Sequence, residues 1–226
     1  MRKVKQVKMG GITFGDGMVR VQSMLSVPST DIAGSVRQAM ALEKAGCEII
    51  RAAIPNEEAV ALIPAIKEQV SVPLVADIHF DYRLALMAVE AGIDKIRINP
   101  GNIGSDDRVK AVADACRSHG IPIRIGVNAG SLEKHILAKY GAPVPEALVE
   151  SALYHVSLLE RFDFDDIVIS IKSSNVQTMI AAYRLLAEKC EYPLHLGVTE
   201  AGTARMGVIK NAIGIGSLLV DGIGDT

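Results

Sequence analysis

Short apolar segments alternate along the chain with longer segments in which apolar residues recur at helical spacing. The eight short segments are Val19–Met24, Glu48–Ile54, Pro73–His79, Lys95–Asn99, Pro122–Asn128, Asp166–Lys172, Pro193–Thr199 and Leu218–Gly222. Helical spacing lies between them, for example in Ile32–Ala45, Tyr82–Ala91 and Val176–Lys189. Strands that alternate with helices predict βαβ units and a parallel sheet.

An internal repeat gives the size of the repeating unit. Ala45–Arg51 and Ala91–Arg97 share Ala-Gly, an acid, Ile and Arg at an offset of 46 residues, because 97 minus 51 is 46. This offset holds two strand–helix units, and eight units close into a barrel more readily than they form an open sheet. The sequence therefore predicts an α/β fold, a (β/α)8 barrel of the TIM type over residues 1–226.

Three segments of the chain are expected to depart from the repeating strand–helix unit. Gly10–Gly17 is expected to form a small hairpin that plugs the barrel floor. Residues 218–222 are expected to form strand eight, and the barrel to lack its last helix. The uncovered seam between strands eight and one is then expected to drive aggregation or formation of a homodimer. The longest interruption, Ser131–Pro145, follows a strand end, where functional loops of this fold lie.

Strand periodicity places a set of cations inside the barrel. Successive strand residues point to opposite sides, and the apolar side must face the helices. The other side then carries Arg51, Arg97, Arg124 and Lys172 toward the barrel axis, with Asn128 at a strand end. Four desolvated cations in one small space indicate an anion site, and their number suits a diphosphate. Alternatively, a single inward arginine forms an ion pair with Asp77 or Glu200, and Asn128 forms a turn.

The glycine-rich end of the chain is a second, weaker indication of a phosphate site. Gly214–Ser217 and Gly222–Asp225 bracket the expected last strand. Backbone N–H groups in such loops bind phosphate, and barrels often place them after strands seven and eight.

Composition excludes several classes of function. The net charge is -2 and aromatic residues form 4% of the chain, which disfavours nucleic-acid binding. No apolar run is long enough to span a membrane, and no signal segment follows the basic start, so a cytoplasmic protein is expected. Cys47, Cys116 and Cys190 have no paired spacing. We therefore expect packing roles for them, and no iron bound to the purified chain.

Six ordered motifs resemble the bacterial 4-hydroxy-3-methylbut-2-enyl diphosphate synthase family. They are Val21–Met24, Ala76–Phe80, Arg97–Asn102, Ile123–Asn128, Leu196–Gly202 and Gly222–Thr226. The resemblance implies an oxidoreductase of the non-mevalonate isoprenoid pathway. It would open the ring of 2-C-methyl-D-erythritol 2,4-cyclodiphosphate with two electrons and release water.

The resemblance also assigns roles to individual residues. It matches Arg51, Arg97, Arg124 and Lys172 to diphosphate ligands, with Asn128 and Ser217 as further candidates. It matches Glu200 to an acid over the reacting carbons and Asp77 to a polar partner in the site, both taken as catalytic.

The same resemblance implies parts that these residues do not supply. In the family a C-terminal domain holds a 4Fe-4S cluster through three cysteines and a glutamate, flavodoxin or ferredoxin donates the electrons, and head-to-tail homodimers pair one cluster with the partner's barrel. The present cysteines do not match that motif, so this chain is expected to bind substrate without turnover. Two alternatives stay open: a Schiff-base aldolase that uses Lys172, whose pKa like-charged neighbours should lower, and a non-catalytic anion-binding module.

Overall fold

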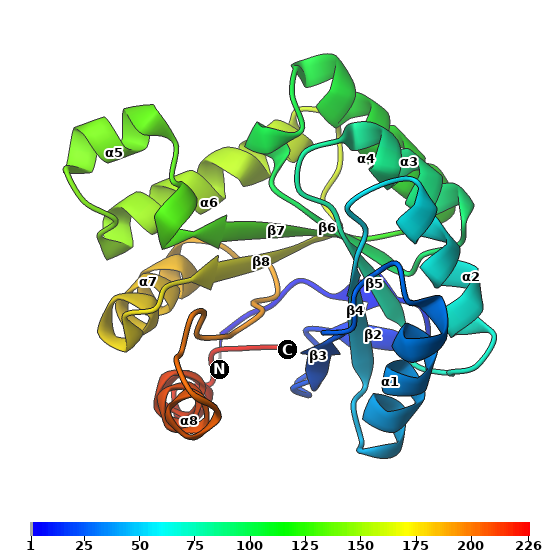
Figure 1. The fold of residues 1–226 in the computed structure, drawn as a ribbon. Helices are drawn as coiled ribbons and strands as arrows, with labels where there is room; N and C mark the ends of the chain where they lie inside the picture. The colour runs from blue at the N-terminus through cyan, green and yellow to red at the C-terminus, as the bar shows by residue number, and fades with distance from the viewer. Residues whose placement is uncertain (1) are drawn as a thin grey trace.

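The computed structural model describes residues 2–226, which form a curled parallel sheet surrounded by helices (Figure 1). An antiparallel hairpin comes first, with β1 (Val7–Met9) and β2 (Ile12–Phe14). The parallel sheet follows in sequential order, from β3 to β8. Its strands are β3 (Gln22–Met24), β4 (Ile49–Ala53), β5 (Leu74–Asp77), β6 (Lys95–Ile98), β7 (Ile123–Asn128) and β8 (Ile167–Lys172).

Helices connect successive strands and cover the outside of the sheet. They are α1 (Ile32–Lys44), α2 (Leu62–Lys67), α3 (Tyr82–Glu90), α4 (Asp106–His119), α5 (Lys134–Tyr140), α6 (Pro145–Glu160), α7 (Val176–Lys189) and α8 (Ala204–Val220), with short 3-10 turns η1 (Glu58–Ala61), η2 (Pro100–Asn102) and η3 (Ala129–Ser131). Local capping sets several of their ends. The Asp31 carboxylate accepts a hydrogen bond from the Gly34 N–H, and Gly120 ends α4 at a left-handed φ of 64°.

The last two strand positions close the ring through a few backbone hydrogen bonds rather than a full ladder. Leu194 pairs with Ile169 of β8 in parallel orientation, which marks the seventh position. The Asp225 N–H donates to the Leu194 carbonyl oxygen at 2.9 Å, and the Arg20 N–H donates to the Asp225 carbonyl oxygen at 3.0 Å. The barrel predicted from the sequence is thus confirmed, with its seventh and eighth positions formed by short extended segments.

The expected eighth strand at residues 218–222 is wrong. Residues 204–220 form α8, and the chain reaches the eighth position only after Gly222. A short apolar run such as Leu218-Leu219-Val220 fits a buried strand and the end of an apolar helix equally well. The interruption at 131–145 likewise contains α5, which extends outward beside α6 in Figure 1.

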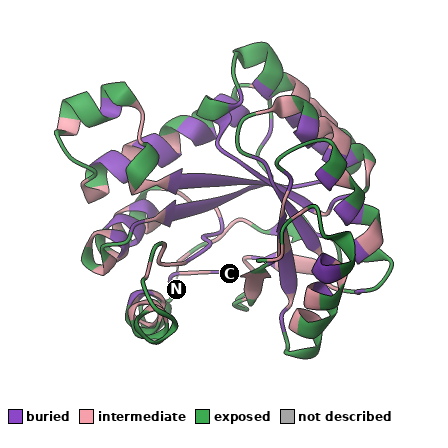
Figure 2. Ribbon diagram, viewed as in Figure 1, coloured by how far each residue is buried: buried purple, intermediate pink, exposed green. Residues whose placement is uncertain are grey.

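The prediction that each strand has an apolar outer side and a polar inner side is confirmed. Outward residues such as Ile50, Ile96 and Ile125 are fully buried in the main core against the helices. Figure 2 shows the sheet buried and the helices exposed on their outer sides. The strand residues between these apolar positions, among them Arg97 and Arg124, face the axis.

The N-terminal hairpin plugs the barrel floor, with bounds slightly earlier than expected. Val7, Met9 and Phe14 form a second apolar cluster with Ile49, Val75 and Val168, and all six are 0% exposed. The Lys95 ammonium lies 4.3 Å from the centroid of the Phe14 ring. The plug therefore separates the polar interior from solvent at the floor, and its aromatic face contacts the lowest cation.

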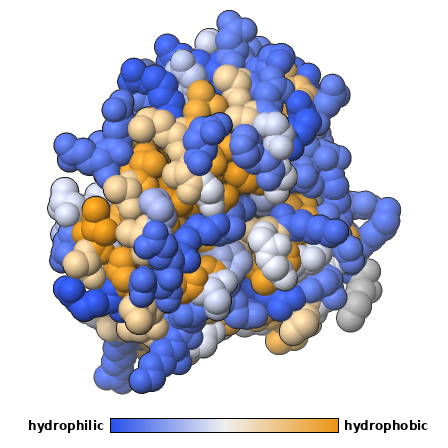
Figure 3. Space-filling model, turned by 90° about the vertical axis from the view of Figure 1, so that its right-hand side faces the viewer, coloured by the Kyte–Doolittle hydropathy of each residue, from blue (hydrophilic) through white to orange (hydrophobic). Residues whose placement is uncertain are grey.

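The outer surface of the barrel has both polar and apolar regions. Figure 3 shows apolar side chains gathered in a band across the face that carries α1, α2 and α3, with polar side chains around it. On another side, α8 exposes Val208 to 70%, Ile213 to 53% and Val220 to 88%. No helix within residues 2–226 is long and apolar enough to cross a membrane.

Replacing Phe14 by Ala tests the floor plug. We expect the free energy of unfolding to fall by about 3–5 kcal/mol, because a fully buried ring is lost and a cavity remains. Urea unfolding followed by circular dichroism measures this change. Phe80 is 72% exposed, so Phe80→Ala is the matched control and should change stability by less than about 0.5 kcal/mol. Equal effects of the two substitutions would contradict the plug.

The exposed face of α8 leads to a second expectation. Apolar surface of this kind favours association, so residues 1–226 should self-associate in sedimentation velocity experiments. The double variant Val208→Glu/Val220→Glu should shift the population toward monomer, because burying two carboxylates in an interface is unfavourable. A wild-type chain that sediments as a monomer at every concentration would count against this expectation.

Candidate functional site

Four basic side chains from four strands of the sheet meet inside the barrel. Arg51 comes from β4, Arg97 from β6, Arg124 from β7 and Lys172 from β8. Arg97 and Arg124 lie directly opposite each other in the register of β6 and β7. Arg51, Arg97 and Arg124 each contribute to lowering the pKa of Lys172. The predicted convergence of the four cations is confirmed, while their binding of a diphosphate stays a prediction.

Asp77 is the internal counter-ion of this group. Its carboxylate pairs with the Arg51 guanidinium through Oδ2 and with Arg97 Nη1 at 3.1 Å through Oδ1. His79 Nε2 lies 3.2 Å from the same Oδ2. Burial alone would raise the pKa of Asp77, but Arg51 and Arg97 hold it below its usual value. Asp77 thus orients two guanidinium groups, which matches the ion-pair alternative for those two arginines.

Arg124 and Lys172 form no ion pair with Asp77, whose charge offsets only part of the effect of burial and of the neighbouring cations on the pKa of each. Arg124 is 1% exposed, and its Nε and Nη1 have no hydrogen-bond partner among the described residues. Burial, followed by the charges of Arg124, Arg51 and Arg97, lowers the pKa of Lys172 to about 7. Buried cations without partners are strongly unfavourable. A bound anion would remove this penalty, and these two side chains are the ones that such an anion would satisfy.

Two further groups extend the polar interior toward the floor. Lys95 is 0% exposed, and burial with the charges of Arg124 and Arg51 lowers its pKa well below the usual value. His195, at the seventh strand position, has its pKa lowered by burial and then by Arg124 and Lys172. Neither was among the site residues expected from the sequence. The sequence could have identified Lys95, because it lies two residues before Arg97 and therefore points to the same side of the strand.

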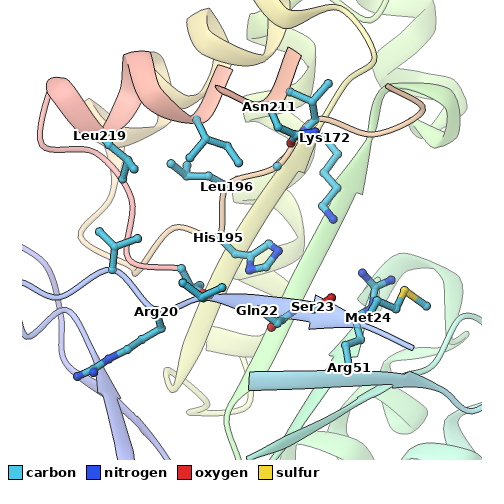
Figure 4. A pocket seen from close by; sticks show the side chains of 16 residues that line it. Arg20, Gln22, Ser23, Met24, Arg51, Lys172, His195, Leu196, Asn211 and Leu219 are labelled. Carbon is cyan, nitrogen blue, oxygen red and sulfur yellow. The ribbon is translucent and has the colours of Figure 1, made fainter. Parts of the chain in front are cut away.

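An open cavity of about 420 Å³ reaches Arg51, Lys172 and His195 of this group from the side of β3 and α8. Figure 4 shows Lys172 and His195 pointing into it, with Arg51 across from them. Leu196, Ile215 and Leu219 form an apolar wall. The cavity therefore offers cationic groups at one side and apolar contacts at the other, which suits a phosphate ester with a small carbon skeleton.

The rim at the strand ends holds Asn128 and Glu200. Both line a pocket of about 280 Å³, and Asn128 also lines a pocket of about 190 Å³ with Arg97 and His79. Glu200 is exposed and has a left-handed φ of 49°. A non-glycine residue in this region costs about 1–3 kcal/mol, and such strain is concentrated at functional sites. The two candidates thus lie together at the rim.

Gly126 gives Arg97 its place. A Cβ on Gly126 would lie 2.6 Å from Arg97 Nη2, so a larger residue at this position would displace the guanidinium. The glycine lies on β7 between Arg124 and Asn128, on the inward side. Strand β7 therefore contributes the inward side chains of Arg124 and Asn128 and, between them, the space that the Arg97 guanidinium occupies.

Ser217 does not lie in a phosphate-binding loop. It is in the last turns of α8, together with Gly214 and Gly216, and it is absent from the residues that line the cavity of Figure 4. The expectation that Gly214–Ser217 forms a loop at a strand end is therefore wrong. A helix uses its backbone N–H groups in its own hydrogen bonds, so these glycines cannot donate to phosphate.

The cysteines do not form a cluster site. Within residues 2–226, no group of three or more His, Cys, Asp and Glu side chains is arranged to hold a metal ion. Cys47 and Cys116 are buried and Cys190 is half-buried, each in a different part of the chain. Burial raises the pKa of Cys116 to about 12. Residues 2–226 therefore do not offer a ligand set that fits an iron-sulfur cluster.

Comparison with known proteins gives close relatives over the whole chain. The family described as the GcpE TIM-barrel domain matches residues 4–226. A Fusobacterium nucleatum protein named 4-hydroxy-3-methylbut-2-en-1-yl diphosphate synthase (flavodoxin) is 58% identical over 99% of this chain and 62% of its own length. Proteins of the same name from Clostridium perfringens and Providencia stuartii are 57% and 54% identical. The chain spans 65% and 62% of those two relatives, so it corresponds to less than two thirds of each.

Solved structures support the fold. A 3-dehydroquinate dehydratase from Enterococcus faecalis aligns with a TM-score of 0.65 at 15% identity, over 92% of this chain and 89% of that one. A Yersinia pestis dihydropteroate synthase aligns with a TM-score of 0.61 at 15% identity, over 95% of this chain and 85% of that one. At this identity the likeness concerns the fold alone. The family match covers nearly every residue of the barrel described above, and the chain belongs to the GcpE TIM-barrel domain family.

Proposed function

We propose that residues 1–226 are the substrate-binding barrel of an enzyme that reductively opens 2-C-methyl-D-erythritol 2,4-cyclodiphosphate to 4-hydroxy-3-methylbut-2-enyl diphosphate. The observation that carries the proposal is the convergence of Arg51, Arg97, Arg124 and Lys172, in which Arg124 has buried nitrogens without a partner and Lys172 has a pKa lowered to about 7 by burial and by the three arginines. The names of the relatives, which describe a synthase of this product, support the same reaction.

The charges of the site suit a cyclic diphosphate. Each phosphorus in such a ring carries one negative charge, so the ligand is a dianion. The Arg124 fork can bind two oxygens at once, and Lys172 supplies a point charge beside it. Asp77 keeps the guanidinium groups of Arg51 and Arg97 in place before the ligand arrives. The geometry favours a ligand with two linked phosphates over one with a single phosphate.

The reaction consumes two electrons and a proton, breaks the ring C–O bond to the diphosphate, and releases the substrate hydroxyl as water. We propose Glu200 as the acid that gives the proton to the departing hydroxyl, because it lies at the rim beside Asn128. For the complete protein we propose flavodoxin as electron donor, a 4Fe-4S cluster held outside these residues, a homodimer and a cytoplasmic location. The barrel alone should then bind substrate without turnover.

The lowered pKa of Lys172 favours one other candidate, a Schiff-base aldolase. With a pKa of about 7, a substantial fraction of the Lys172 amine is neutral near pH 7 and can attack a carbonyl. Borohydride reduction in the presence of a carbonyl substrate would trap the adduct on Lys172, and mass spectrometry would detect it. A chain that binds the cyclic diphosphate and gives no trapped adduct favours the synthase over the aldolase. A full-length protein that binds the cyclic diphosphate but shows no turnover would favour the third alternative, a non-catalytic anion-binding module.

Replacing Arg124 by Met tests the anion site directly. We expect binding of the cyclic diphosphate, measured by calorimetric titration at fixed salt, to weaken about ten- to hundredfold, since a charge-assisted contact contributes about 1.5–3 kcal/mol. The free energy of unfolding without ligand should rise by about 1 kcal/mol or more, because an uncompensated buried charge is removed. Arg124→Lys should restore only part of the affinity.

Arg97→Met provides the contrast. Affinity should fall by a similar factor, but the free energy of unfolding should also fall, because Asp77 loses one of its two arginine partners. Arg117 contacts Asp114 and the Phe162 carbonyl on the outside of α4, and Arg117→Met should leave affinity unchanged. Unchanged affinity in both Arg97→Met and Arg124→Met would mean that these arginines do not bind the ligand.

The pKa of Lys172 predicts a pH dependence of binding. The cyclic diphosphate has no group that titrates near neutrality, so its charge is constant there. Lys172 loses its proton as pH rises through about 7. We therefore expect affinity to fall about tenfold from pH 6 to pH 8 in wild type. Lys172→Arg keeps the charge and should give a flat profile. Parallel profiles in the two proteins would show that another group titrates.

A further inference from the structure

A buried histidine on α6 joins the two rim loops that follow β6 and β7. His155 is 0% exposed and lies outside the cationic interior. One ring nitrogen contacts Gly101 in the loop after β6, and the other contacts Glu133 in the loop after β7. Neither His155 nor Glu133 lines the cavities that hold the proposed ligand. Their contacts nevertheless reach the segments that do.

The first contact fixes the loop after β6. The Gly101 N–H is shared between Asn99 Oδ1 at 3.1 Å and His155 Nδ1 at 3.2 Å. A Cβ on Gly101 would lie 2.5 Å from His155 Cε1, so the imidazole packs directly on this backbone. Because Asn99 Oδ1 accepts from Gly101, the amide NH2 of Asn99 is turned away from that contact. Asn99 lines the pocket of about 190 Å³ beside Arg97.

The second contact fixes the loop after β7. With Nδ1 acting as acceptor, His155 Nε2 carries the proton and donates to Glu133 Oε1. Burial alone would raise the pKa of Glu133, but the hydrogen bond from His155, together with Ser151 and the Glu133 backbone, lowers it to about 2, so the group is a carboxylate. Glu133 directly precedes α5 and follows η3, and η3 begins just after Asn128. The contact between His155 and Glu133 therefore anchors the loop that follows Asn128.

We propose that the buried His155 and the half-buried Glu133 form a clamp that positions the rim loops, so that Asn99 and Asn128 meet the phosphate ester in fixed orientations. The inference rests on the proposed function for the identity of the ligand. His155 and Glu133 are positioning residues, since they act through the backbone of Gly101 and through the loop that follows Asn128. The clamp lowers the ordering cost of binding, because the two loops are already held when the ligand arrives.

Three substitutions of His155 separate the two ties. His155→Asn keeps an acceptor near the place of Nδ1, His155→Gln keeps a donor near the place of Nε2, and His155→Leu keeps neither. Hydrogen exchange measured by mass spectrometry should rise in residues 99–104 for His155→Gln and in residues 129–134 for His155→Asn. His155→Leu should show both increases. Calorimetric titration with the cyclic diphosphate should show about tenfold weaker binding for His155→Leu and a smaller loss for the other two.

Leu159→Ala is the control on the same helix. Leu159 is 0% exposed in the core, so the variant should be destabilised while its affinity and its rim exchange stay at wild-type values. A folded His155→Leu that binds as tightly as wild type would overturn the clamp. If that variant does not fold, the Gln and Asn variants decide, and an increase in the same loop for both, or in neither, overturns it. A wild-type chain that does not bind the cyclic diphosphate refutes the proposed function, while the exchange pattern still tests the clamp.

Discussion

The structure depends on placing several uncompensated positive charges on the axis of a barrel. Barrel interiors are commonly filled with branched apolar side chains in layers. Here the inward positions hold Arg51, Arg97, Arg124, Lys95 and Lys172, and one carboxylate, Asp77, balances two of them. Desolvation and mutual repulsion oppose this arrangement. The rest of the molecule has to supply the free energy that keeps these groups in place.

That free energy comes from the outer layer and the floor. The outward strand residues and the inner faces of the helices form one continuous apolar core. The N-terminal hairpin adds a second apolar cluster below the charges and places the Phe14 ring against Lys95. The polar interior is thus enclosed on its sides and below, and it is open toward the rim and the side of α8. An anion can reach the cations only from those open sides.

The elements around the opening share the task of fixing polar groups. Asp77 orients two guanidinium groups, Gly126 leaves the space that one of them needs, and the His155–Glu133 pair ties two rim loops. Each of these devices reduces the freedom of a group that would otherwise have to be ordered on binding. Arg124 and Lys172 are different from Arg51 and Arg97, because neither forms an ion pair with Asp77 in the described chain, and a ligand anion would supply the missing counter-charge. Preorganised donors and unsatisfied charges therefore occupy the same small volume.

The sequence by itself determined the barrel, the inward parity of its polar residues and the convergence of four cations. These follow from local rules, since a period of two fixes the side of each strand residue and parallel strands present their ends at one rim. The end of the chain was misread because an apolar run of a few residues fits a strand and a helix equally, and only packing assigned Leu218–Val220 and Ser217 to α8. Tertiary structure alone decided that Asp77 pairs with Arg51 and Arg97 while Arg124 stays unpaired. It also decided that His155 reaches Gly101 and Glu133, because contacts between residues 22 and 54 positions apart depend on the docking of α6 and carry no periodic signal in the chain.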